Sequence, residues 1–222
     1  MAIEKRTPVM AQVGDKATHE VMRNTYMMLS LTLLFSALMA GVSMLLAVPA
    51  WISLLTLGGA LVLMWFVLPK TAHSMAGLGV VFAITGLLGF GLGPTLTYYL
   101  SMPGGGELVM TAMGGTGAIF LGLSAYTLIT RQDFSFMGGF LVVGLVVILL
   151  ALLGNLFLNL PGLSMALSAG VILLMSGFIL YDTSRMIHGG EDNYLFITVS
   201  LFLSIFNIFV HLLSLLGMSQ ND

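Results

Sequence analysis

Seven nearly continuous apolar runs follow one another along this chain, and no other feature limits its fold so strongly. A helix needs about 20 residues to cross the ~30 Å hydrocarbon core of a bilayer, and each run has about that length. The strands of a membrane barrel are shorter and alternate apolar with polar residues, which these runs do not do. The runs therefore predict an all-α integral membrane protein with seven transmembrane helices.

The composition supports this class. Hydrophobic residues make up 58% of the chain and charged residues 7%, with a mean hydropathy of +1.06. A soluble domain carries about 25% charged residues, so this chain cannot cover a water-facing surface. It has no cysteine, which excludes disulfides, thiolate metal sites and cysteine nucleophiles.

Proline and glycine mark the ends of the runs and divide the chain into three parts. A polar N-terminal tail covers residues 1–23, a seven-helix domain covers 24–217, and a short C-terminal tail covers 218–222. The predicted spans are 24–46, 51–68, 75–100, 107–129, 135–158, 163–187 and 194–217.

Lysine and arginine predict the orientation, because short cytoplasmic loops carry an excess of them. With seven spans, all seven basic residues fall on the same side of the membrane. They lie in the tail, after the second and fourth spans, and near the end of the sixth. The N-terminus is therefore predicted to be cytoplasmic and the C-terminus to lie outside.

Asp182 is the charged residue most deeply placed within a predicted span. It lies about 8 Å from the inner end of the sixth span, at 1.5 Å per residue. A carboxylate there is costly to insert and marks a candidate functional site. Two interpretations remain open: a local pair with Arg185, three residues on, or a group that faces the bundle interior and titrates or binds a cation.

The seventh span carries a polar stripe that could face Asp182. Ser200, Ser204 and Asn207 share one helical face by their spacing of four and then three residues. The stripe is either a hydrogen-bonding contact between helices or part of an ion pathway.

Small residues in two spans predict close helix packing. Gly89 and Gly93 are four residues apart in the third span. Gly114, Ala118 and Gly122 form a similar row in the fourth.

The chain offers little for catalysis or for nucleic acid. The four histidines are too scattered to supply three ligands to one zinc ion, so no metal site is expected. A serine and histidine pair can be drawn from His211 with Ser101 or Ser164, but no motif supports it. No basic patch beyond the tail could bind nucleic acid. We therefore expect no enzyme and no cofactor.

Several segments resemble the transmembrane BAX inhibitor motif family. The segment Tyr181-Asp182-Thr183, followed by a short loop and Leu201 to Asn207, is similar to the family signature. The segments Met22 to Tyr26, Ser124-Ala125-Tyr126 and His188 to Glu191 are similar to its bacterial YccA-like branch, whose members are inner-membrane proteins.

The resemblance implies seven helices with the last one central, and a pH-sensitive leak of cations such as calcium or protons. It places two acidic residues on the last two helices. Asp182 matches the first, whereas Ser204 stands at the second position and is not acidic. This difference weakens the expectation for calcium, which prefers several oxygen ligands.

The YccA-like branch also implies a role as a modulator of the membrane-anchored protease FtsH. The cytoplasmic tail, with Lys5, Arg6 and Lys16, is then the expected contact with the protease. Two functions are thus expected: protease modulation through the tail, or ion leakage along Asp182, Arg185 and the stripe of Ser200, Ser204 and Asn207. The expected partners are therefore the protease, a permeating cation and the lipid bilayer.

Overall fold

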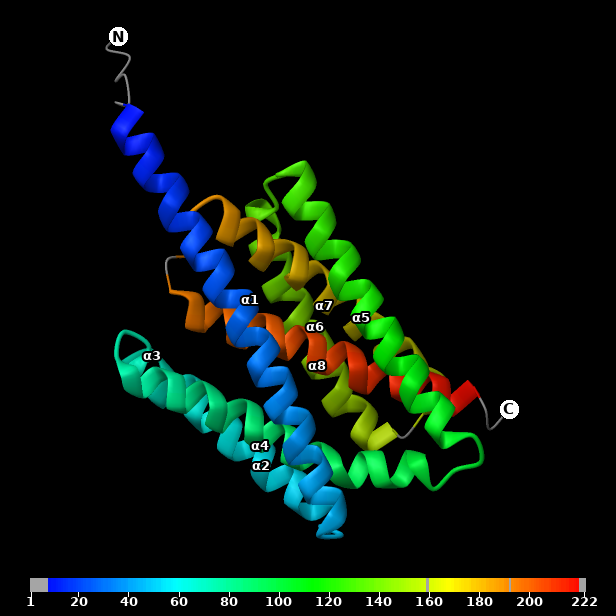
Figure 1. Cartoon of the computed structure of the whole chain (residues 1–222). Coiled ribbons are helices and arrows are strands. Elements are labelled where there is room, and N and C mark those ends of the chain that lie inside the picture. The colour runs from blue at the N-terminus through cyan, green and yellow to red at the C-terminus, as the bar shows by residue number, and fades with distance from the viewer. Residues whose placement is uncertain (1–7, 159, 192, 220–222) are drawn as a thin grey trace.

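The computed structural model describes residues 8–158, 160–191 and 193–219, which form helices joined by short connections (Figure 1). In chain order the elements are α1 (Pro8–Leu45), α2 (Trp51–Val62), the π-helical turn η1 (Leu63–Val67), α3 (Leu68–Thr71), α4 (Met75–Leu100), α5 (Gly105–Thr130), the 3-10 turn η2 (Ser135–Met137), α6 (Gly138–Leu158), α7 (Pro161–Ile187) and α8 (Tyr194–Ser219).

Seven segments are long and apolar enough to cross a membrane, which confirms the predicted number of spans. They are Thr18–Leu45, Trp51–Thr71, Met75–Leu100, Gly105–Thr130, Ser135–Leu158, Gly162–Ile187 and Tyr194–Ser219. The first begins earlier than the predicted residue 24, and α1 itself already begins at Pro8. An odd number of crossings puts the two termini on opposite sides, and the side that faces the cytoplasm stays a prediction.

The second span passes through the proline that was expected to end it. Pro69 lies in α3, and the helical path continues to Thr71. Proline supplies no backbone N–H and its ring crowds the preceding turn. The wider turn Leu63–Val67 comes directly before it and bonds the Leu68 N–H to the Leu63 carbonyl. This turn lets the helix accommodate the proline instead of stopping.

Helix α8 is the centre of the bundle, as the resemblance implied. It packs against α1, α4, α5 and α7, whereas α2 packs on α4 and α6 packs on α7 at the periphery. Leu201, Ile208 and Leu213 of α8 have no exposed surface, and Phe202 has 1%. Four of the six other spans therefore contact the last helix directly, and the remaining two form an outer layer.

The small residues of the third span pack as predicted, but those of the fourth do not. Gly89 lies against the backbone of α1, where an added Cβ would come within 2.2 Å of the Ser36 carbonyl oxygen. Gly93 lies equally close to Ser43. In contrast, Gly114 and Gly122 have nothing within 4 Å of such a Cβ, and their row faces away from the bundle. The prediction of tight packing for that row was wrong within this chain.

Candidate functional site

Asp182 faces the central helix. Its side chain is buried, with 4% of its surface exposed, and its Oδ2 accepts a hydrogen bond of 2.5 Å from the Ser200 hydroxyl on α8. This bond joins the C-terminal part of α7 to the N-terminal part of α8, the two helices that carry the candidate residues. Asp182 thus lies between helices, inside the bundle and within a membrane span.

Arg185 points away from Asp182. Its guanidinium forms an ion pair of 3.0 Å with Glu191, donates to the Gly190 carbonyl at 3.1 Å and lies 5.4 Å from the centre of the Tyr181 ring. Among the described residues no ion pair joins it to Asp182. The local pairing of Asp182 with Arg185 is therefore wrong, because a better acceptor lies in the loop that follows α7. Arg185 and Glu191 remain close enough to act on Asp182 electrostatically.

The other two members of the polar stripe lie deeper along α8 and are not bonded to Asp182 in the described part of the chain. Ser204 is buried, with 2% exposed. The amide of Asn207 donates to the Leu203 carbonyl of its own helix at 2.8 Å. At 1.5 Å per residue, these residues lie about 6 and 10 Å beyond Ser200. The structure therefore brings Ser200 to Asp182 and leaves Ser204 and Asn207 further inside.

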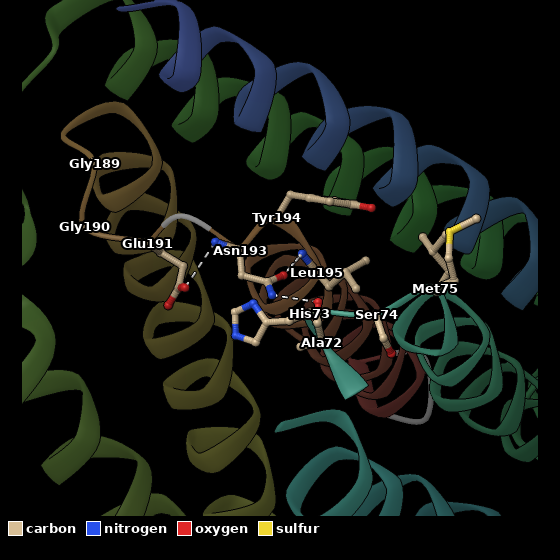
Figure 2. A pocket seen from close by; sticks show the side chains of 11 residues that line it. Ala72, His73, Ser74, Met75, Gly189, Gly190, Glu191, Asn193, Tyr194 and Leu195 are labelled. Carbon is tan, nitrogen blue, oxygen red and sulfur yellow. Dashed lines mark hydrogen bonds between the residues drawn. The ribbon is translucent and has the colours of Figure 1, made fainter. Parts of the chain in front are cut away.

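An open cavity of about 680 Å³ lies at the same end of the bundle, between the α3–α4 and α7–α8 connections. Figure 2 shows Asn193 in its middle. The Asn193 side chain donates to the Ala72 carbonyl at 2.8 Å and accepts from the Leu195 N–H at 2.9 Å, which caps the start of α8. The Glu191 carboxylate accepts from the Asn193 N–H at 3.3 Å, and His73 lines the same cavity. Asn193 thus ties the α3–α4 connection to the central helix.

Three segments that carry the family resemblance meet at a second buried cluster, which sequence reasoning missed. The hydroxyl of Tyr26 on α1 faces those of Ser124 on α5 and Thr183 on α7. Among the described residues, none of the three hydroxyl oxygens has a hydrogen-bond partner of normal geometry. The cluster therefore gathers three polar groups from three helices inside the bundle. The motifs contain these residues, but only the packing of the helices shows that they meet.

Ser184 is a further residue that the sequence did not single out. It is fully buried, and its hydroxyl accepts from the Phe134 N–H at 2.8 Å and lies 3.3 Å from the Gln132 carbonyl. Its own carbonyl lies 2.9 Å from the ring nitrogen of His188. Ser184 therefore fixes the α5–α6 connection to the end of α7, two residues beyond Asp182.

Asp133 in that connection is held by Ser135. The Ser135 hydroxyl donates to the Asp133 carboxylate, and the Ser135 N–H does so at 2.9 Å. These hydrogen bonds hold the pKa of Asp133 below its usual value. The carboxylate therefore stays charged and caps the start of η2.

His211, the histidine of the last span, lies beside a serine other than Ser101 and Ser164, which the sequence had suggested. The ring of His211 lies 3.2 Å from the hydroxyl of Ser168 on α7. Ser164 instead accepts from the Asn155 amide at 2.7 Å. In the described part of the chain, no three His, Asp or Glu side chains come together to hold a metal ion.

The three basic residues expected to contact a partner are Lys5, Arg6 and Lys16. Lys5 and Arg6 are outside the described residues. Lys16 lies in the part of α1 that precedes the first membrane span, which begins at Thr18.

Comparisons with known proteins identify the family of this chain. The family described as inhibitor of apoptosis-promoting Bax1 matches residues 18–221. The Modulator of FtsH protease YccA of Escherichia coli K12 is 51% identical over 206 residues, which cover 93% of each chain. The Inner membrane protein YccA of E. coli strain CFT073 matches equally well. An uncharacterized protein of Pseudomonas aeruginosa is 46% identical over 91% of this chain and 90% of its own.

The family description and the names of these relatives state no enzymatic reaction. The match spans nearly the whole chain, including all seven spans, so it concerns the complete bundle. The chain is accordingly a multi-pass protein of the inner membrane. It belongs to the BAX inhibitor family, among the bacterial YccA-like proteins.

Proposed function

We propose that this protein modulates a membrane-anchored, ATP-dependent protease of the FtsH kind and that it has no enzymatic activity of its own. The observation that carries the proposal is the 51% identity, over 93% of both chains, with the relative named Modulator of FtsH protease.

The proposed contact is the N-terminal segment with Lys5, Arg6 and Lys16. Helix α1 continues for ten residues before its membrane span, from Pro8 to Thr18, and Figure 1 shows this end extending past the other helices. Ten helical residues reach about 15 Å. A helix that projects in this way can be engaged without unfolding the bundle.

Deletion of residues 2–17 should abolish co-purification with the protease while the bundle stays folded. The first membrane span begins at Thr18, so this deletion leaves all seven spans intact. The measurement is pull-down of the protease from solubilised membranes, with thermal unfolding of each purified variant. The matched control deletes residues 220–222 at the opposite end and should bind as the wild type does. Equal co-purification after the N-terminal deletion would refute this contact.

We infer a second candidate function, a pathway for protons or monovalent cations at Asp182. The observation that favours it is the buried Asp182 carboxyl, which bonds to Ser200 and not to Arg185. A calcium ion takes six to eight oxygen ligands, and the single carboxyl with one serine hydroxyl offers too few. A proton or a monovalent cation needs fewer, so these are the proposed species.

Asp182→Asn should abolish the pH dependence of ion flux in liposomes, because the amide keeps the size of the side chain but cannot titrate. The measurement is dye-reported flux of protons and of sodium ions across a series of pH values. The matched control is Glu107→Gln, which removes a carboxylate in the first turn of α5 and leaves Asp182 and the groups around it unchanged. Identical flux curves for the wild type and Asp182→Asn would exclude this function.

A further inference from the structure

Besides Asp182, one other acidic or histidine side chain lies deep within a span, and it is His211 of α8. In the described spans, these two are the only Asp, Glu or His residues more than four residues from a span end. Asp182 lies five residues before the end of α7, and His211 lies eight residues before the end of α8. These distances are about 8 and 12 Å at 1.5 Å per residue. Ionisable groups inside spans are costly and mark proton or ion pathways.

The two groups lie toward opposite ends of the same helix pair. Asp182 of α7 accepts a hydrogen bond from Ser200 of α8, and Ser168 of α7 lies 3.2 Å from a ring nitrogen of His211 on α8. From the first contact to the second, the residue numbers fall along α7 and rise along α8, so the two helices run in opposite directions. Their interface therefore carries one titratable group toward each face of the membrane.

The polar stripe of α8 connects these two groups. Ser200, Ser204, Asn207 and His211 follow one another at spacings of four, three and four residues, which keeps all four on one helical face. Ser204 is buried and Asn207 is half-buried. Eleven residues separate Ser200 from His211, which is about 16 Å of helix. The stripe therefore leads from one titratable group to the other through the hydrocarbon core.

The chemistry of His211 fits a proton better than a metal cation. An imidazole takes up a proton on a ring nitrogen and offers no oxygen ligand to a sodium ion. One ring nitrogen of His211 lies beside Ser168, which leaves the other for the proton. In the described part of the chain, no three His, Asp or Glu side chains meet, so a bound metal does not account for this histidine.

The described helices around α8 place no other ionisable side chain at the depth of His211. Helices α1, α4, α5 and α7 pack against α8, and the second half of α1 and the first half of α7 carry none. The ionisable side chains of α4 and α5 at this end, all within two residues of a helix end, are Tyr98, Tyr99 and Glu107. The described residues include no ion pair to His211. Near Asp182, the charges are those of Arg185 and Glu191.

We propose that His211 is the second relay residue of the pathway at Asp182 and that the ion which moves along this pathway is the proton. A proton from the C-terminal side of the membrane binds the free ring nitrogen of His211 and forms an imidazolium ion. It leaves His211 along the stripe and protonates the Asp182 carboxylate, which releases it on the side of the α7–α8 connection. The proposal rests on the ion pathway at Asp182 and is independent of protease modulation.

The test compares His211→Gln with His211→Glu in liposomes that hold the purified full-length protein and a pH-sensitive dye. Glutamine keeps a hydrogen-bonding group beside Ser168 but cannot titrate, whereas glutamate can carry a proton. His211→Gln should lower the proton flux about a hundredfold, the lower end of what a positioned proton-transfer group contributes in enzymes. His211→Glu should keep most of the flux with a displaced pH profile. A purely structural contact between α7 and α8 would instead favour the glutamine.

The matched control is Ser176→Ala in the same span as Asp182. The Ser176 hydroxyl donates to the Ile172 carbonyl of its own helix at 2.8 Å. Six residues from Asp182, it is turned about 120° around α7 at 3.6 residues per turn, so its removal should leave the flux unchanged. Thermal unfolding shows which variants are folded, and His211→Asn with His211→Asp repeats the comparison if the longer pair does not fold.

The outcomes separate this proposal from the pathway on which it rests. The proposal is overturned if His211→Gln conducts as the wild type does, if His211→Glu conducts no better than His211→Gln, or if the wild type moves sodium ions as fast as protons. Loss of flux in Asp182→Asn with normal flux in His211→Gln would overturn this proposal alone. Equal flux in the wild type and Asp182→Asn would remove the pathway as well.

Discussion

Gly89→Ala should destabilise the bundle by about 3 kcal/mol or more, at the upper end of the cost of overpacking. The new Cβ would lie 2.2 Å from the Ser36 carbonyl oxygen and 2.7 Å from the Ser36 Cα. Carbon and backbone atoms normally stay 3.5–4.0 Å apart, so α1 and α4 would have to separate by about 1 Å. Backbone atoms cannot turn aside as a side chain can, and the strain spreads along the whole contact between the two helices.

The check is the free energy of unfolding of the purified protein in detergent, measured beside Gly79→Ala. Gly79 lies in the same helix, is exposed and has nothing within 4 Å of an added Cβ. Alanine favours a helix over glycine by about 1 kcal/mol, so the control should be neutral or more stable. Equal stability of the two variants would show that α1 and α4 are not packed through Gly89.

The number of spans and most of their bounds could be predicted because length and hydropathy are local properties of the sequence. Which helices pack against one another is not a local property of the sequence. The row Gly114, Ala118 and Gly122 looks like the pair Gly89 and Gly93 in the sequence, yet only the pair packs against another helix. Pro69 was taken for the end of a span because a local rule says that proline stops helices. The π-helical turn Leu63–Val67 lets the helix continue through Pro69, and that local rule does not predict such a turn.

The candidate site was predictable in its residues but only partly in its contacts. The polar stripe on α8 correctly placed Ser200 where it can reach Asp182. Spacing along α7 suggested Arg185 as the partner of Asp182, whereas Glu191 holds Arg185 from the following loop. The cluster of Tyr26, Ser124 and Thr183 involves three helices far apart in the sequence, so no periodicity could indicate it.

Ser200→Ala should cost about 1–3 kcal/mol, because it leaves the buried Asp182 oxygen without its donor. Asp182→Ala removes the acceptor of the same bond. If their bond is what holds Asp182, Ser200→Ala and Asp182→Ala are not additive, and a double-mutant cycle should give a coupling of about 0.5–3 kcal/mol.

A control cycle separates this coupling from a general loss of stability. Ser53 bonds to the Gly91 carbonyl between α2 and α4, far from Asp182. Ser53→Ala combined with Asp182→Ala should therefore be additive to within about 0.5 kcal/mol. The ion pathway proposed at Asp182 requires a carboxyl that faces α8, and the coupling with Ser200 measures that orientation directly. Additive effects of Ser200→Ala and Asp182→Ala would mean that the carboxyl is held by other groups, and would remove the geometric basis for the pathway without touching the proposed contact with the protease.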